Sequence, residues 1–341
     1  MSASDLSRPV FIVGCPRSGN TLLGCILNKH PEFLIFFEQN LFSALYRRWD
    51  SRVRGGADRQ ETFLQLTERY CSDVIEAAGI DLPDYRSQIR RTDGTWQTLL
   101  NEFACFAMEA GKPSACRFGD KTPHHIARTA IIARHYPYAQ FLFVYRDPRD
   151  TVFSMTKESF PYTSNDPVLN AHVVGNYYET FRTPIEEGTP KNVFDVRYED
   201  LVRDPETVTR EICDFLEVEY TASMLEAKEG PIQALVGAGW VDYKGWGEVR
   251  PQPSSKANPL KDDPVMNWML DEWIQSLGYD RSTSRPGLPE RLRARFQTLP
   301  MRLQEMVFSI PWRWKYPKHS PFLLEKPVTK RQIKSWLTGG E

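Results

Sequence analysis

The residues from Gly14 to Thr21 have the types and spacing that bind a phosphate group. They follow the pattern G-x-x-x-x-G-K-[ST], except that Asn20 stands in the lysine position and Arg17 lies inside the loop. Between a strand and a helix, the backbone N–H groups of such a loop point inward and the helix dipole adds positive potential. The missing lysine is the residue that reaches the outer phosphates of a nucleoside triphosphate. The loop therefore predicts a cradle for a phosphate-type anion.

A second group of polar residues follows a later apolar run. Arg146 comes directly after that run, and Ser154 stands further on in a helical pattern. A kinase or nucleotide hydrolase needs an aspartate at such a strand end to hold Mg²⁺, whereas a cation there suits a second phosphate. Arginine and serine could both donate to one phosphate. The alternative is that the segment only forms surface ion pairs, of Arg146 and Arg149 with Asp147 and Asp150.

Alternating strands and helices must hold these residues in place. Apolar runs of strand length lie at residues 10–13, 33–37, 141–145 and 192–198. Helical patterns lie at residues 22–27, 127–136, 149–158, 206–216 and 267–277. This alternation predicts an α/β fold of the P-loop type, with a parallel sheet flanked by helices.

Three segments lie outside this alternation. Residues 41–119 have helical patterns and no obvious strand, which predicts a helical insertion, a kind of segment in which ligand specificity often resides. Residues 230–263 are rich in Gly, Pro, Ser and Lys and predict a long loop, of a kind that is usually functional or mobile. Residues 286–341 carry 11 Lys and Arg against 4 Asp and Glu, together with several aromatic residues. We expect a main domain over residues 1–285 and a basic C-terminal extension over residues 286–341.

The composition is that of an ordinary globular chain of 341 residues. Lys and Arg number 43 against 44 Asp and Glu, a balance that argues against a dedicated nucleic-acid binder. The sequence contains neither a long apolar run nor a recognisable signal peptide, so we expect a cytoplasmic protein. The six cysteines are scattered without a C-x-x-C pair, which favours buried thiols over a zinc site or disulfides.

The motifs as a set resemble those of the sulfotransferase family, in its bacterial and tyrosylprotein-type branches. Residues 14–23 (GCPRSGNTLL) are similar to its 5′-phosphosulfate loop, and residues 143–154 to its 3′-phosphate motif. Residues 119–124 (GDKTPH) and 197–201 (RYEDL) are similar to further segments, in family order over residues 9–217. The resemblance implies transfer of a sulfuryl group from 3′-phosphoadenosine 5′-phosphosulfate (PAPS) to an alcohol, phenol or amine, with PAP as the other product. Asn20 departs from the threonine that is common in the family.

The resemblance also assigns roles to residues. Lys121 would reach the bridging oxygen or a sulfuryl oxygen, a task that suits a compact ammonium group. Tyr198 would contact the nucleotide, unless it is an ordinary core aromatic. A late loop over the 3′-phosphate would include Lys244 and Gly245 or lie nearer Lys256, and no metal is implied. The other residues that would contact PAPS are Arg17, which would also be catalytic, Ser18, Gly19, Asn20, Thr21, Arg146 and Ser154.

The acceptor hydroxyl needs a base. Glu38 follows the apolar run that ends at Phe37, at a strand end where ligands bind in open α/β sheets. The resemblance places a catalytic glutamate at this point, and burial among neighbouring phenylalanines would raise its pKa. The alternatives are a merely solvated carboxylate at Glu38, and a catalytic His124 or His125.

The acceptor stays open: a small molecule, a carbohydrate or a lipid. The residues of the insertion that could line its site, or else form core, are Tyr46, Arg47, Arg48, Trp49, Tyr85 and Trp96. The basic extension could pack on the domain, bind a partner subunit or rest weakly on an anionic membrane.

Two other functions compete with sulfuryl transfer. One is a P-loop kinase of small molecules, disfavoured by Asn20 and Arg146. The other is a non-catalytic nucleotide-binding module, disfavoured by Glu38 and Lys121.

Overall fold

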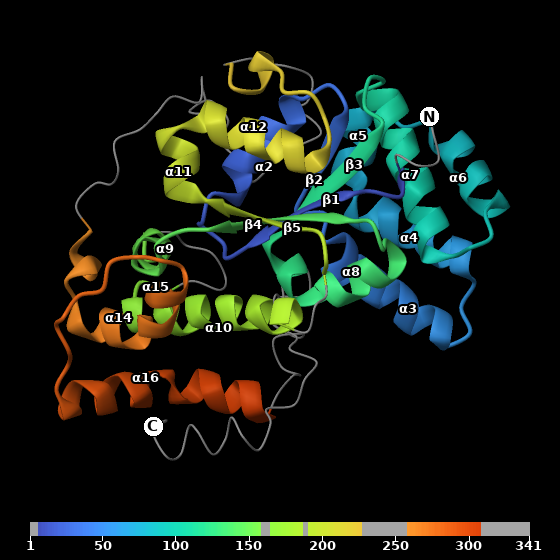
Figure 1. Cartoon of the computed structure of the whole chain (residues 1–341). Helices are drawn as coiled ribbons and strands as arrows, with labels where there is room; N and C mark the ends of the chain where they lie inside the picture. The colour runs from blue at the N-terminus through green and yellow to red at the C-terminus, as the bar shows by residue number, and fades with distance from the viewer. Residues whose placement is uncertain (1–5, 158–163, 187–189, 227–257, 308–341) are drawn as a thin grey trace. The chain divides into compact units, whose positions relative to one another are not determined.

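The computed structural model describes residues 6–157, 164–186, 190–226 and 258–307 (Figure 1). It contains a five-stranded sheet in the order β2-β3-β1-β4-β5. All neighbouring strands run parallel, so the chain must cross a face of the sheet between them. The fold is therefore α/β, as the sequence predicts. The strands are β1 (Val10–Gly14), β2 (Phe33–Phe37), β3 (Arg117–Lys121), β4 (Gln140–Tyr145) and β5 (Val193–Arg197).

β3 lies inside the sheet, between β1 and β2. The helical insertion was expected to run to residue 119. This end was wrong, because β3 already begins at Arg117. The whole of β3 is buried, although it contains Gly119, Asp120 and Lys121. Glycine and charged residues are depleted in strands, so the pattern of the sequence did not reveal this one. Gly119 meets a need for space, because a Cβ there would lie 2.4 Å from the Val10 carbonyl oxygen.

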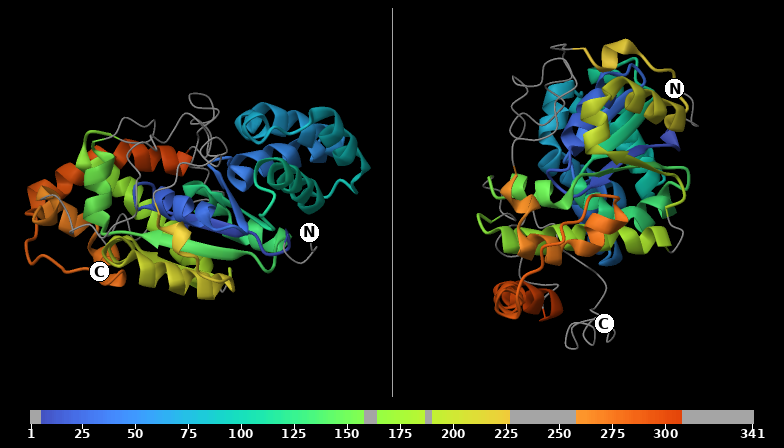
Figure 2. Two further views of the ribbon diagram at one scale, coloured as in Figure 1. Left: turned by 90° about the horizontal axis from the view of Figure 1, so that it is seen from above. Right: turned by 60° about the vertical axis from the view of Figure 1, so that its left-hand side comes forward.

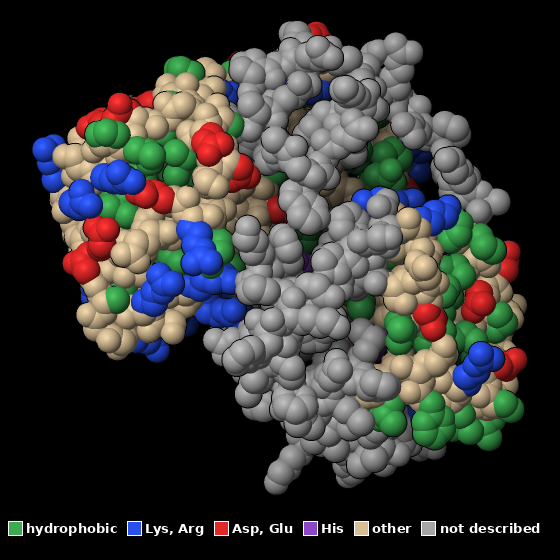
Figure 3. All heavy atoms as spheres, turned by 180° about the vertical axis from the view of Figure 1, so that it is seen from behind, with side chains coloured by type: hydrophobic (Ala, Val, Ile, Leu, Met, Phe, Trp, Pro, Cys, Tyr) green, Lys and Arg blue, Asp and Glu red, His purple; other side chains and the backbone are tan. Residues whose placement is uncertain are grey.

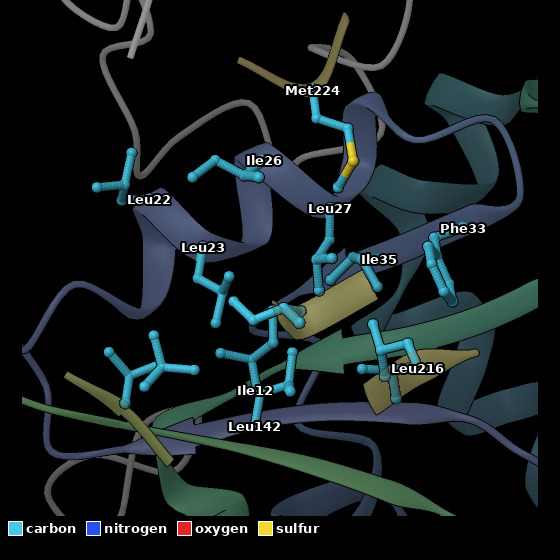
Figure 4. Packing of buried hydrophobic residues seen from close by; sticks show 14 of the residues in the cluster. Ile12, Leu22, Leu23, Ile26, Leu27, Phe33, Ile35, Leu142, Leu216 and Met224 are labelled. Carbon is cyan, nitrogen blue, oxygen red and sulfur yellow. The ribbon is translucent and has the colours of Figure 1, made fainter. Parts of the chain in front are cut away.

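Helices cover both faces of the sheet. α2 (Asn20–Lys29) and α12 (Pro205–Leu216) lie on one face and α8 (Thr129–His135) on the other (Figures 1 and 2). Leu23 and Leu27 of α2 point toward Ile12, Ile35 and Leu142 of the sheet (Figure 4), and all are buried. Each such leucine stabilises the fold by about 1.5–3 kcal/mol. This layer fixes the start of α2 and, with it, the loop that precedes the helix.

The insertion is helical between β2 and β3. Asp58, Asp81 and Thr95 cap three of its helices by accepting a backbone N–H in the first turn. Tyr85 and Trp96 are fully buried, so they are core residues. The elements are a π-helical turn (Leu41–Tyr46), α3 (Arg47–Arg54), α4 (Arg59–Tyr70), α5 (Ser72–Ala78), α6 (Leu82–Arg91) and α7 (Trp96–Gly111).

Side chains occupy the free edge of β2. The Ile35 N–H donates to Asn28 Oδ1 at 2.7 Å, and Asn28 Nδ2 donates to the Ile35 carbonyl at 2.9 Å. Lys112 Nζ donates to the Phe33 carbonyl at 2.6 Å and to two carbonyls at the end of α2. Burial lowers the pKa of Lys112 to about 8. The bonds to Ile35 and Phe33 satisfy backbone groups of β2 at the edge of the sheet, and the other two satisfy carbonyls at the end of α2.

The chain separates into two compact units. The first holds residues 1–146 and 180–255, with the whole sheet, and the second holds residues 147–179 and 256–341. The expected boundary at residue 285 falls inside the second unit and stays a prediction.

The helix expected at 267–277 is two helices, α14 (Pro264–Met269) and α15 (Asp271–Ser276). The other helices are α9 (Pro148–Met155), α10 (Pro167–Glu186), which crosses the unit boundary, α11 (Tyr198–Arg203), α16 (Leu288–Val307) and three 3₁₀ turns (Pro123–Arg128, Ala222–Met224 and Pro259–Lys261).

The surface fits the balanced charge of the sequence. Acidic and basic side chains lie interspersed over much of the described surface on the face drawn in Figure 3, where one group of basic side chains also gathers. α16, at the start of the basic extension, buries Ala294 and Thr298 and exposes Leu288, Leu292 and Phe296. No helix in the described part of the chain is long and apolar enough to cross a membrane.

Candidate active site

The carboxyl ends of the strands bring the predicted residues of the first unit to one edge of the sheet. The parallel register pairs Phe37 with Lys121, Gly14 with Val144 and Tyr145 with Arg197. The residues at the strand ends, in sheet order, are Glu38 after β2, Lys121 in β3, Gly14 in β1, Arg146 after β4 and Tyr198 after β5. Ligands of open α/β sheets bind at this edge.

Two glycines shape the loop between β1 and α2. Gly14 has φ 150° and Gly19, the N-cap of α2, has φ 104°. A Cβ at Gly14 would lie 2.2 Å from the Val144 carbonyl oxygen, and a Cβ at Gly19 would lie 2.4 Å from Tyr198 Cδ2. A side chain at Gly14 would collide with the backbone of β4, and one at Gly19 would collide with the Tyr198 ring. The loop can therefore approach β4 and Tyr198 this closely only because positions 14 and 19 are glycine.

Two polar side chains of the loop, Asn20 and Ser18, differ in their hydrogen bonding. Asn20 Nδ2 donates to the Cys15 carbonyl at 2.8 Å, so this amide closes the loop on itself. The Ser18 hydroxyl is buried and has no hydrogen-bond partner among the described residues. A buried polar group without a partner costs about 1–3 kcal/mol, which an oxygen of a bound phosphate would offset. Arg17 is exposed and has φ 70°, a left-handed conformation that is uncommon outside glycine.

Arg146 and Tyr198 lie against this loop. The Arg146 guanidinium carbon lies 4.6 Å from the centroid of the Tyr198 ring, and Arg146 Nη1 donates to the Arg17 carbonyl at 3.5 Å. Because the same ring lies beside Gly19, it both fills the space next to the loop and orients the cation. The two predicted phosphate motifs thus meet within the first unit.

The rest of the second motif lies in the second unit. Arg149 is buried and forms a two-pronged pair with Asp147, at 3.0 and 2.8 Å. Asp150 accepts a hydrogen bond from Asn258 at 2.7 Å. The alternative of ion pairing is therefore right for Arg149, but the pair is buried and not on the surface. Ser154, the other predicted phosphate ligand, lies in α9.

Lys121 and Glu38 form an ion pair. Lys121 Nζ donates to Glu38 Oε1 at 2.7 Å, and the Glu38 N–H donates to the Lys121 carbonyl at 2.9 Å. The Lys121 side chain is 2% exposed, whereas the Glu38 side chain is 47% exposed. The expectation that Glu38 is buried among phenylalanines was wrong. Glu38 has φ 54°, and this left-handed turn at the end of β2 leaves its carboxylate half exposed.

The two histidines differ in their surroundings. His125 is fully buried, and its Nε2 lies 2.7 Å from Asp120 Oδ2. This burial argues against His125 as the base, because a base must reach the acceptor. His124 is partly exposed and stays a candidate. Lys244, Gly245 and Lys256 lie outside the described residues.

The family model described as "Sulfotransferase family" matches residues 9–222, which contain all five strands and the loop. This chain belongs to the sulfotransferase family. PAPS is the general sulfuryl donor of sulfotransferases, and PAP is what remains of it. The glycine cradle, the buried Ser18 hydroxyl and the cations Arg146 and Lys121 fit such a doubly phosphorylated nucleotide.

Relatives of this sulfotransferase cover most of its length. A putative protein-tyrosine sulfotransferase of Caenorhabditis briggsae is 24% identical over 298 residues, which span 83% of this chain and 93% of that protein. Protein-tyrosine sulfotransferase 1 of Danio rerio is 24% identical over 302 residues, which span 83% of this chain and 76% of that protein. The sulfotransferase domain of the Synechococcus PCC 7002 olefin synthase is 20% identical, with a TM-score of 0.51, and the match covers 81% of this chain and 97% of that domain. This last similarity confirms the fold.

Proposed function

We propose that this sulfotransferase moves the sulfuryl group of PAPS to a hydroxyl group, or less readily an amine, with Glu38 as the base. The observation that carries the proposal is the edge of the sheet at which Glu38, Lys121, the Gly14–Thr21 loop, Arg146 and Tyr198 follow one another across five strand ends. One edge thus offers a carboxylate, a buried ammonium and an anion cradle in sequence.

The loop and Lys121 hold the donor and balance its charge. PAPS, once bound, supplies a sulfuryl group whose bond to the phosphate oxygen breaks with the electron pair going to PAP. The start of α2 and the Ser18 hydroxyl, which is buried and has no hydrogen-bond partner among the described residues, are suited to the 5′-phosphosulfate. Lys121 would stabilise the charge that develops on the leaving phosphate, and stabilisation of that charge lowers the barrier.

Glu38 takes the proton of the attacking hydroxyl. Lys121 neutralises the Glu38 carboxylate at 2.7 Å before a donor is present. A sulfuryl or phosphate oxygen competes for the same ammonium, so the bound donor releases the carboxylate for proton transfer. The pair thus links the basicity of Glu38 to the presence of the donor. His124 is the alternative base, because it follows Lys121 and is partly exposed.

The acceptor classes that we propose are a small molecule, a carbohydrate and a lipid. Tyr85 and Trp96 are buried in the core and do not bind it. The relatives named protein-tyrosine sulfotransferases add a tyrosine side chain in a polypeptide as a further class to test. An acceptor screen with sulfur-labelled PAPS should therefore include phenols, sugars, hydroxylated lipids and tyrosine peptides.

Donor binding is tested by thermal denaturation with PAP and with ATP plus Mg²⁺. We expect PAP to raise the melting temperature. At 100 times its Kd, bound PAP should add about 2.7 kcal/mol to the free energy of unfolding. ATP with Mg²⁺ should stabilise the chain far less, because Arg146 stands where a magnesium-binding carboxylate would be needed. The reversed preference would indicate the kinase alternative. PAP binding without sulfuryl transfer to any acceptor of the screen would indicate the non-catalytic module.

A further inference from the structure

Asp120 and His125 form a fully buried pair next to the proposed active site. His125 Nε2 lies 2.7 Å from Asp120 Oδ2, and Asp120 directly precedes Lys121. The His125 ring packs edge-on against Phe11 and Phe42, with ring centroids 5.7 and 6.1 Å apart. Because these rings fix the imidazole, His125 in turn fixes the Asp120 carboxylate. Neither residue can touch a substrate from this position.

Asp120 reaches the backbone that follows Glu38. Its Oδ2 accepts the Leu41 N–H at 3.3 Å, and its Oδ1 accepts the Thr122 hydroxyl at 2.8 Å. The Thr122 oxygen in turn accepts the Asn40 N–H at 3.4 Å. One buried carboxylate therefore joins the residues after β3 to the residues after β2.

The turn that these bonds hold has an uncommon conformation. Glu38 has φ 54° and Asn40 has φ 55°, both in the left-handed region. Such conformations persist only where the surrounding structure imposes them. The Asn40 and Leu41 N–H groups receive that restraint from Thr122 and Asp120. The direction in which the Glu38 carboxylate points therefore depends on this network.

We propose that Asp120, Thr122 and His125 are positioning residues, which hold the Glu38 turn so that Glu38 stays aligned with Lys121. The inference rests on the proposed function, in which Glu38 is the base. A purely structural network would affect stability alone. A positioning network affects kcat, while the phosphate loop and its affinity for PAP stay intact.

The hydroxyl of Thr122 gives a clean test, because valine has nearly the same shape without it. We expect Thr122→Val to lower kcat by about 10- to 100-fold, as a misplaced base does, with the Kd for PAP within about twofold. Thr122→Ser keeps the hydroxyl and should restore most of kcat. Thr129→Val is the matched control, because the Thr129 hydroxyl is equally buried and has no partner among the described residues.

Amide hydrogen exchange supplies a readout that does not depend on activity. In Thr122→Val, the peptide that contains Asn40 and Leu41 should exchange at least several times faster than in the wild type, with other peptides unchanged. Thr122→Ala serves in the same way if the valine variant does not fold. Wild-type kcat in a variant whose turn exchanges faster would overturn the positioning role. No transfer by the wild type to any acceptor would remove the proposed function, and the inference with it.

Discussion

Lys121 combines deep burial with an exposed partner, and this asymmetry explains how the pair can open. The ammonium lies over the Phe37 ring and its side chain is 2% exposed, whereas the Glu38 carboxylate is half exposed. Breaking the pair therefore needs movement of the glutamate and not of the lysine. In the proposed function, the more exposed partner of this ion pair is the base.

Glu38→Gln should separate chemistry from binding. We expect kcat to fall by about 100- to 10,000-fold, because an amide cannot take the acceptor proton. The affinity for PAP should not fall, because the phosphate loop is untouched and Lys121 no longer pairs with a carboxylate. Isothermal titration with PAP and initial rates with labelled PAPS measure the two effects. Glu109→Gln, at an exposed position of α7, is the control, and full activity of Glu38→Gln would make His124 the stronger candidate.

Gly19→Ala should weaken PAP binding. The added Cβ would lie 2.4 Å from Tyr198 Cδ2, so the ring and the Arg146 above it must shift. Gly79→Ala is a matched control, because Gly79 also has a positive φ, 71°, but nothing lies within 4 Å of its Cβ position. Both variants carry backbone strain of about 1–2 kcal/mol. Only Gly19→Ala should also lose at least tenfold in PAP affinity, and equal affinities would show that the Tyr198 contact is irrelevant to binding.

Site residues that are close together in the sequence can be predicted more easily than site residues that only the fold brings together. The Gly14–Thr21 loop is contiguous, so its glycines and Asn20 could be recognised from spacing alone. The contact of Thr122 with the turn after β2 joins residues far apart in sequence. It exists only because β3 lies beside β2, and that strand was not predicted. The exposure of Glu38 likewise depends on a backbone angle that apolar patterns do not encode.

At the scale of elements, Lys112 joins α7, α2 and β2. Lys112→Met should destabilise the fold by about 3 kcal/mol or more, because three buried carbonyls lose their donor. Chemical denaturation measures the free energy of unfolding. Ser114→Ala is the control, since Ser114 donates one exposed hydrogen bond to the Pro31 carbonyl. A Lys112→Met variant as stable as this control would show that water or rearrangement satisfies those carbonyls.

The elements that the sequence predicts are those with strong apolar periodicity. β1, β2, β4 and β5 all lie close to the predicted runs, and so do α2 and α12. β3 was missed because charged residues and a glycine interrupt its apolar pattern. The segment predicted as one helix at 267–277 breaks at Leu270, between α14 and α15. Apolar spacing continues across that break, so periodicity alone did not show it.

At the scale of the whole molecule, α16 has two unlike faces. Leu292 and Phe296 are 44% and 69% exposed, whereas Ala294 is 3% exposed. Replacement of Leu292 and Phe296 by glutamine should change stability by less than about 0.5 kcal/mol per site and leave kcat unchanged. Ala294→Gln should destabilise by about 1–3 kcal/mol through overpacking. A large loss of stability in the double variant would indicate that another part of the basic extension packs on this face of α16.

The free edge of β2 has a consequence for how copies of this protein behave at high concentration. A bare parallel edge is a template on which another polypeptide can add in register, the first step of fibrillar aggregation. Here Asn28 imitates the missing neighbour at Ile35, and Lys112 places an amine beside Phe33. An incoming segment would have to displace both before it could form its first ladder rung. Solutions of the native protein should therefore resist seeded fibril growth at this edge.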